Sequence, residues 1–284
     1  MKHKFLFILL FSLVLEGMVA TQAVAGDYVH QVNTLIGTKG TGLTSGYLYP
    51  GATYPYGMVQ FTPSYFSKRS GFVINQLSGG GCEHMGNFPT FPVKGKLKMS
   101  PDNILNYRIS VSEEKGHAGY YEAMVQEDIK AKLTVTERTG MASYEYPADQ
   151  QYGTIIIGGG ISATPIEQAA IVITAPNKCE GYAEGGNFCG LRTPYKVYFI
   201  AEFDTDALET GTWKREELMP NTTFAEGEYS GVYFTFDVNK KKNIQYKIGV
   251  SYVSVENARE NLKAENAGWD FQKIQNQAEA KWNH

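Results

Sequence analysis

Segments with the composition of strands recur at short spacing along almost the whole chain, and helical patterning is nearly absent before Ser254. They are rich in β-branched and aromatic residues and are bounded by turn residues, which is typical of strands. The predicted strands are 56–62, 118–126, 130–137, 140–146, 153–158, 169–174, 194–203, 231–238 and 244–253. Strands without interleaved helices form antiparallel sheets, so the pattern predicts an all-β sandwich or barrel.

Two helices are predicted at the C-terminal end. Ser254 is a good N-cap residue, Glu256 lies in the first turn, and Val255, Ala258 and Leu262 share one helical face. Gly268 separates this helix from the next. The predicted organisation is therefore a sandwich domain over residues 26–253 and a helical linker over residues 254–284.

The second helix, over 269–284, has an apolar stripe made by Phe271, Ile274, Ala278 and Trp282. No C-cap residue or proline follows it within the chain. Because an apolar stripe needs a burial partner, we expect that partner to lie beyond His284. The chain then resembles the front part of a larger protein.

The first residues have the features of a secretory signal peptide. Lys2, His3 and Lys4 are basic, 5–15 is an apolar run too short to span a bilayer, and 23–25 is a small-x-small cleavage site. No cysteine follows that would carry a lipid anchor. We therefore expect residues 1–25 to be removed and the protein to be secreted or periplasmic, without a membrane anchor.

The net charge excludes one class of binding partner, and the cysteines limit which disulfides can form. A formal net charge of −3 is too near neutral for a nucleic-acid binder. The chain has 3 cysteines. In an oxidising compartment Cys179 and Cys189 either form a disulfide across a glycine-rich segment or remain packed thiols, and Cys82 is left over.

Two long segments, 36–51 and 77–89, are rich in glycine and lack periodicity. Long loops in a compact domain are often functional. The alternative is that these glycines serve tight turns alone.

Several blocks in this order closely resemble the N-terminal domain of glycoside hydrolase family 92, a family of bacterial exo-acting α-mannosidases. The most specific block is Pro50-Gly51-Ala52-Thr53-x-Pro55-x-Gly57-Met58-x-Gln60. The supporting blocks are 32–38, 77–82, 118–121, 132–138 and 253–258. The resemblance covers the chain from about Tyr28 to its end.

The resemblance implies a galactose-mutarotase-like β-sandwich, followed by a linker helix pair and a larger helical domain. It also implies calcium-dependent hydrolysis of terminal α-mannosidic bonds with inversion, which needs a carboxylic acid and a carboxylate base. In the family both carboxylates and the calcium ligands lie in the helical domain. This chain is therefore expected to contain no catalytic residue and no metal site of its own.

The glycine-rich segments would then close one wall of the sugar pocket. The predicted substrate-binding residues are Tyr47, Tyr49, Cys82, Glu83, His84 and Asn87. Cys82 matches a family cysteine, whereas His84 and Asn87 stand where many members carry Asp. The polar residues can hydrogen-bond sugar hydroxyls, and Tyr47 or Tyr49 can stack on a pyranose face. The alternative for His84 is a loop histidine bonded to the backbone.

Three functions follow from this sequence. The chain is a fragment of an α-mannosidase that is inactive alone, a stand-alone carbohydrate-binding module, or a structural half that pairs with a separate catalytic chain. The expected partners are a mannose-containing glycan and a catalytic helical domain, in cis or in trans.

Overall fold

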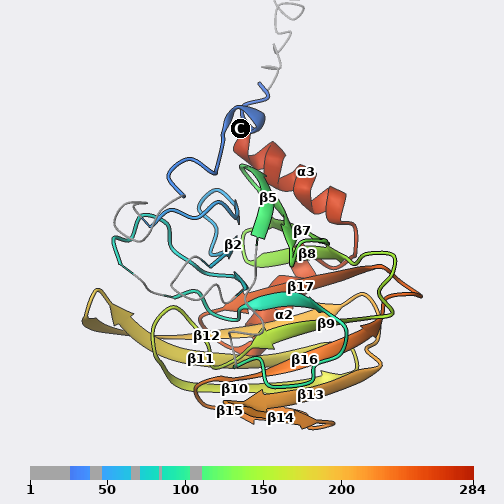
Figure 1. Cartoon of the computed structure of the whole chain (residues 1–284). Helices are drawn as coiled ribbons and strands as arrows, with labels where there is room; N and C mark the ends of the chain where they lie inside the picture. The colour runs from blue at the N-terminus through green and yellow to red at the C-terminus, as the bar shows by residue number, and fades with distance from the viewer. Residues whose placement is uncertain (1–25, 39–46, 65–70, 83–84, 103–110) are drawn as a thin grey trace, which may run out of the picture.

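The protein is a sandwich of two antiparallel β-sheets with two helices packed on it (Figure 1). A computed structural model describes residues 26–38, 47–64, 71–82, 85–102 and 111–284. The predicted signal peptide, Glu83 and His84 lie outside the described residues. The all-β sandwich with a C-terminal helix pair is thus confirmed.

The first sheet has eight strands. In spatial order they are β1 (Ala52–Thr53), β2 (Gln60–Pro63), β3 (Phe72–Val73), β4 (Thr90–Lys94), β9 (Tyr152–Gly158), β16 (Ser230–Asp237), β13 (Glu209–Lys214) and β14 (Glu217–Pro220).

The second sheet has nine strands. Their spatial order is β15 (Phe224–Glu226), β10 (Ile166–Ala175), β11 (Lys178–Phe188), β12 (Leu191–Phe203), β17 (Asn243–Ser251), β8 (Thr139–Glu145), β7 (Ile129–Val135), β6 (Tyr120–Val125) and β5 (Val111–His117). A 3-10 helix, η1 (Val29–Gln31), precedes both sheets and contacts β5.

The sequence predicts the long strands well and misses several others. β11 was not predicted, because its run Glu180-Gly181-Tyr182-Ala183-Glu184-Gly185-Gly186 is glycine-rich and has low intrinsic strand propensity. It forms because it pairs with β10 on one side and β12 on the other. β3 has only two residues, and β4 contains Pro92, so neither has a clear local signal.

Aromatic side chains fill the space between the sheets. Phe203 of β12 has its ring centroid 4.8 Å from that of Phe234 and 5.1 Å from that of Phe236, both on β16 of the opposite sheet. All three are at most 1% exposed. Burial of such side chains is the main stabilising contribution to a sandwich, roughly 1.5–3 kcal/mol for each fully buried large apolar residue.

The second sheet is buried on both faces where the helices cover it. α2 (Val255–Glu265) lies on β17 and β12, with Ala258 and Leu262 buried against Ile200. The Ser254 hydroxyl accepts a hydrogen bond from the Asn257 backbone N–H at 3.1 Å, which confirms the predicted N-cap. β17 directly beneath this helix has Gly249, whose absent side chain lets the helix backbone approach closely.

A buried lysine ties the end of α2 to the same sheet. Lys247 of β17 is 3% exposed, and its Nζ donates to the carbonyl oxygens of Asn266 and Ala267, both at 3.1 Å. A cation near the last carbonyls of a helix is favourable. Burial lowers the pKa of Lys247, and the nearby carboxylate of Glu202 opposes that shift.

The second helix, α3 (Phe271–Trp282), corrects one expectation from the sequence. Part of its apolar stripe has a burial partner within the described chain: Ile274 and Ala278 are buried where the helix packs on β6, β7 and β8, whereas Phe271 is half-buried. Gly119 makes this contact possible, since a Cβ there would lie 2.9 Å from the Cβ of Ala278. Trp282, although 38% exposed, donates its indole N–H to the carbonyl of Thr53 at 2.8 Å.

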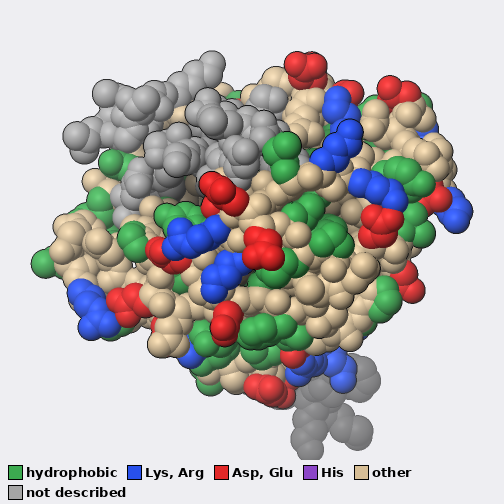
Figure 2. Space-filling view, turned by 60° about the horizontal axis from the view of Figure 1, so that its bottom comes forward, with side chains coloured by type: hydrophobic (Ala, Val, Ile, Leu, Met, Phe, Trp, Pro, Cys, Tyr) green, Lys and Arg blue, Asp and Glu red, His purple; other side chains and the backbone are tan. Residues whose placement is uncertain are grey.

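The described side chains on the face drawn in Figure 2 form no strongly charged region. Figure 2 shows acidic and basic side chains interspersed over one face, without a broad patch of one sign. Among the described residues, none of the helices has the length and apolar character needed to cross a membrane.

Candidate functional site

The two glycine-rich segments meet at one end of the sandwich, as their predicted common role requires. The backbone N–H of Gly79 donates to the carbonyl of Tyr47 at 2.9 Å. The Ser78 hydroxyl accepts from the Tyr49 backbone N–H at 3.2 Å and from the Gln60 side-chain amide at 2.8 Å. The segments are therefore bonded to each other and to the start of β2.

A disulfide fixes the second segment to the tip of the β11–β12 hairpin. It joins Cys82 to Cys189, with a Cα–Cα distance of 5.4 Å and a sequence separation of 107 residues. Of the two alternatives for Cys179 and Cys189, the bridge between them is excluded, and Cys82 is not left over. Cys179 points into the core from β11 as a fully buried free thiol, whose pKa burial raises, while Cys189 lies in the turn.

A cluster of amides and tyrosines lies beneath this loop. The side-chain oxygen of Asn87 accepts from the Asn75 amide at 3.0 Å and from the Tyr195 hydroxyl at 2.9 Å. The Asn75 side chain in turn accepts from the Asn87 backbone N–H at 2.7 Å, and its amide lies 3.4 Å from the Tyr252 hydroxyl. Asn75 also forms a β-bridge with Gln60, so this cluster adjoins the Ser78 contacts.

The cluster can donate and accept hydrogen bonds, but it supplies no acid or base. Burial raises the pKa of Tyr195, and its bond to Asn87 lowers it less, so the phenol stays protonated near neutral pH. The Asn87 side-chain N–H₂ is buried and has no hydrogen-bond partner among the described residues. Neutral amides and hydroxyls of this kind suit the hydroxyl groups of a sugar.

The predicted site residues divide into three groups. Cys82 and Asn87 belong to the assembled site, the first as half of a disulfide and the second as a fully buried amide. Tyr49 is 7% exposed, and the stacking of its ring on a sugar stays a prediction. Tyr47 is half-buried at a positive φ of 53°, and its stacking stays a prediction. Glu83 and His84 lie outside the described residues.

Sequence reasoning missed Tyr195 and Tyr252. Tyr195 lies 108 residues from Asn87, and Tyr252 lies 177 residues from Asn75. Neither tyrosine stands in a glycine-rich segment. The only available signal was their place within or directly after strands that border the loops.

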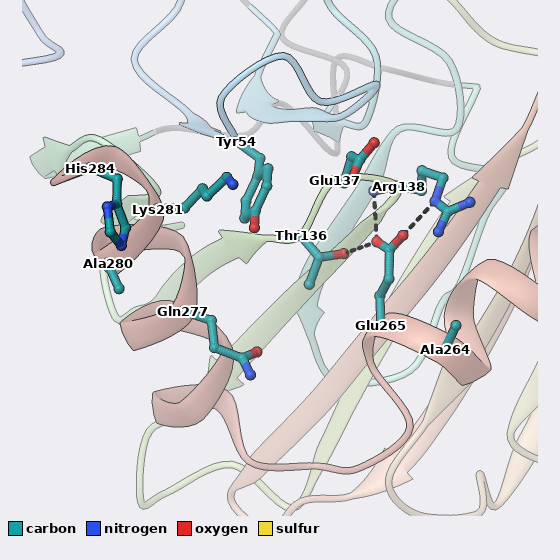
Figure 3. A pocket seen from close by; sticks show the side chains of 10 residues that line it. All are labelled: Tyr54, Thr136, Glu137, Arg138, Ala264, Glu265, Gln277, Ala280, Lys281 and His284. Atoms are coloured by element: carbon teal, nitrogen blue, oxygen red, sulfur yellow. Dashed lines mark hydrogen bonds and ion pairs between the residues drawn. The ribbon is translucent and has the colours of Figure 1, made fainter.

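A hollow lies on the helix-covered side of the sandwich. It is a groove of about 760 Å³ between the C-terminal half of α3, the end of α2 and the β7–β8 turn (Figure 3). The Glu265 carboxylate within it accepts hydrogen bonds from the Thr136 hydroxyl at 2.6 Å and the Arg138 backbone N–H at 2.9 Å. It also binds the Arg138 guanidinium. These bonds tie the end of α2 to the β7–β8 turn, so Glu265 has a structural role here.

The described residues do not fit the calcium ion that the resemblance implies. Calcium takes six to eight oxygen ligands. In the described part of the chain, the one group of three or more potential side-chain ligands is His30, His117 and Glu279, which offers two imidazoles. No step that involves calcium is therefore assigned to these residues.

Comparison with known proteins agrees with this architecture. An uncharacterized secreted glycosidase from Arthroderma benhamiae is 26% identical over 313 residues, which cover 95% of this chain and 40% of that protein. A family GH92 α-mannosidase from Bacteroides thetaiotaomicron superposes with a TM-score of 0.77 at 24% identity, covering 91% of this chain and 38% of its own. A family GH92 inverting mannosidase from the same organism gives a TM-score of 0.75 at 23% identity, with 93% and 36% coverage.

The chain thus spans about 40% or less of the length of these relatives. The two solved structures share its fold, a sandwich of two β-sheets. Residues 31–251 match the Glycosyl hydrolase family 92 N-terminal domain. With most of its length matched in this way, the chain belongs to glycosyl hydrolase family 92.

Proposed function

We propose that this chain forms the β-sandwich wall of the sugar pocket in a secreted, calcium-dependent, inverting exo-α-mannosidase. The observation that carries the proposal is the family match over residues 31–251. The names of the relatives support it, since the solved structures are called an α-mannosidase and an inverting mannosidase, and the curated relative is called secreted.

In this proposal the sandwich binds and orients the sugar, and a helical domain carries out the hydrolysis. Inversion needs two carboxyl groups on opposite sides of the glycosidic bond. The site at the loop end contributes amides and tyrosine hydroxyls, which suit binding and not proton transfer. The two catalytic carboxylates and the calcium ion would come from the helical domain.

The test is to express the chain with whatever its gene encodes after His284 and to measure mannose release from an α-mannoside, with calcium and after its chelation. We expect calcium-dependent release from the longer protein and none from the 284-residue chain. Asn75→Ala should raise the KM of the longer enzyme, because it removes two bonds that hold Asn87. Gln277→Ala, on the exposed face of α3, is the matched control. Turnover by the 284-residue chain alone would overturn the proposal.

A carbohydrate-binding module is the second candidate, and the docking of α3 favours it. Each helix buries two apolar residues against the sandwich, Ala258 and Leu262 in α2 and Ile274 and Ala278 in α3, so sugar binding can be measured without a further domain. Calorimetry with methyl α-mannoside, and with methyl α-glucoside as the control, measures whether the chain alone binds mannose as a binding module would. Specific binding together with no activity in any longer product of the gene would favour the module.

A further inference from the structure

Two histidines and a glutamate from three distant parts of the chain meet where the N-terminal segment crosses α3. His30 lies in η1, His117 ends β5, and Glu279 lies in α3. One ligand atom from each lies within 4.8 Å of the other two. Figure 1 shows the N-terminal segment and the C-terminal end of α3 side by side at the top of the molecule.

We propose that His30, His117 and Glu279 bind a divalent transition-metal ion of the zinc class. Two imidazoles and one carboxylate are a ligand set that zinc uses in proteins, with the remaining position left to water. This differs from the expectation that the chain holds no metal. It also differs from a calcium site, because calcium prefers oxygen ligands.

The geometry is close to what such an ion requires. His117 Nε2 and Glu279 Oε1 are already 2.8 Å apart, and the two side chains are each 17% exposed. Ligand atoms about 2.0–2.2 Å from a tetrahedral zinc are roughly 3.3 Å from each other. The more exposed His30 therefore has to move by roughly 1–2 Å to complete the set, and its ring centroid is already 4.6 Å from that of His117.

The surroundings orient the ligands in the way that metal sites commonly do. Asp27 Oδ1 lies 2.6 Å from His30 Nδ1, so a neutral His30 donates that N–H to Asp27 and keeps the Nε2 lone pair for the metal. Gln275 donates to Glu279 Oε1 at 2.7 Å, and the His117 ring stacks on Tyr120 with a centroid distance of 5.1 Å. For His117 Nε2 to bind the metal, the ring proton of the neutral imidazole must lie on Nδ1, so the metal replaces the hydrogen bond between His117 and Glu279.

The bound ion would fasten the N-terminal segment to α3 and to the edge strand β5. The N-terminal segment and the end of α3 are already in contact without a metal. The Asn283 side-chain oxygen accepts hydrogen bonds from the backbone N–H groups of Tyr28 at 2.8 Å and Val29 at 3.0 Å. Because the ligands come together only in the folded chain, metal binding should stabilise the folded state.

The experiment uses protein without a polyhistidine tag, stripped with a chelator and then titrated with Zn²⁺. We expect one bound zinc per chain and a rise in Tm with Zn²⁺ that Ca²⁺ does not reproduce. His30→Ala should weaken zinc binding at least 10-fold with little change in the metal-free Tm, because His30 is exposed. Glu279→Gln keeps the side-chain shape, and should weaken binding similarly.

Two further variants distinguish zinc binding at this site from nonspecific binding by surface histidines. Asp27→Asn, a change at a positioning residue, should weaken zinc binding by about 10-fold while the stoichiometry stays at one. His284→Ala, at an exposed histidine outside the cluster, should leave the affinity unchanged. The proposal is overturned if zinc does not bind, if His30→Ala and Glu279→Gln bind zinc as tightly as the parent, or if Ca²⁺ gives the same stabilisation.

Discussion

The loop end of the molecule and the helix-covered face of its second sheet are held by different interactions. At the loop end, the Cys82–Cys189 disulfide and the hydrogen bonds around Asn87 join separate segments, beside the packing of Phe88 against Phe199. On the helix-covered face, apolar side chains pack closely, and Gly249 and Gly119 bring the helices near the sheet. Covalent and polar bonds therefore help to hold the loops in place, whereas apolar packing holds the helices on the sheet.

The largest expected effect is loss of the disulfide. Cys189→Ser should lower the free energy of unfolding of the oxidised protein by about 4 kcal/mol, because the bridge closes a loop of 107 residues in the unfolded chain. Urea unfolding measures the change, and the parent protein in reductant is the control. Peptide mapping that links Cys179 to Cys189 would contradict the assignment of the loop end.

The second-largest loss of stability is expected where α2 packs on the sheet. Gly249→Val should destabilise the fold by about 3 kcal/mol through overpacking. A Cβ at Gly249 would lie 2.5 Å from the Ala258 carbonyl oxygen. The control is Gly268→Ala, which meets nothing within 4 Å and should change stability by less than about 0.5 kcal/mol. Equal losses of stability from the two substitutions would mean that the close packing of α2 on β17 does not stabilise the fold.

The docking of α3 should have a somewhat smaller effect. Ile274→Ala should cost about 2 kcal/mol, because it removes apolar atoms from a buried side chain. Thermal unfolding, with the exposed Gln277→Ala as the matched control, measures the difference. If both variants match the parent, α3 is undocked in solution and the exposed stripe expected from the sequence is the better description.

A smaller loss is expected at the polar cluster. Tyr195→Phe removes one hydrogen bond to Asn87 and should lower the free energy of unfolding by about 1 kcal/mol. Tyr198→Phe is the control on the same strand, since side chains three residues apart point to opposite faces of a sheet. A larger loss from Tyr198→Phe than from Tyr195→Phe would mean that the buried hydroxyl does not support the loop end.

The smallest effect is a pH dependence on the helix-covered face. Burial raises the pKa of Glu202, but hydrogen bonding from Lys178 and the charge of Lys247 outweigh it, and the net pKa lies below the ordinary value. Stability from this group is therefore present above about pH 4.5 and is lost as the pH falls through the lower folded-state pKa. Glu202→Gln should flatten the acid limb of a stability–pH curve. Glu256→Gln, at an exposed position, should leave it unchanged.

The fold could be predicted in most of its long strands because their signals are local. Alternation in residues 130–136 and the apolar run at 196–203 correspond to β7 and β12. The Ser254 N-cap was likewise predicted from neighbouring residues and is confirmed. β11 could not be predicted, since its glycines acquire strand conformation only through two paired neighbours.

The candidate site could be predicted only in part. Its two glycine-rich segments and Asn87 stand out in the sequence, and the structure bonds the segments together. Of the tyrosines that complete it, Tyr195 lies within β12 and Tyr252 directly follows β17, and neither position stands out in the sequence. Their role depends on which strands become neighbours across the sandwich.

The sequence by itself determined the class of fold, the N-cap of α2 and the family, because strand patterns, a cap and family blocks are each recognised in short stretches of sequence. The tertiary structure decided which cysteines pair, where the stripe of α3 is buried, and that His30 meets Glu279. Each of these contacts joins distant residues, such as the 107 positions between the bonded cysteines. Local propensity carries no information over such a separation. The order of strands in the two sheets sets which distant residues meet, and that order follows from packing the whole core.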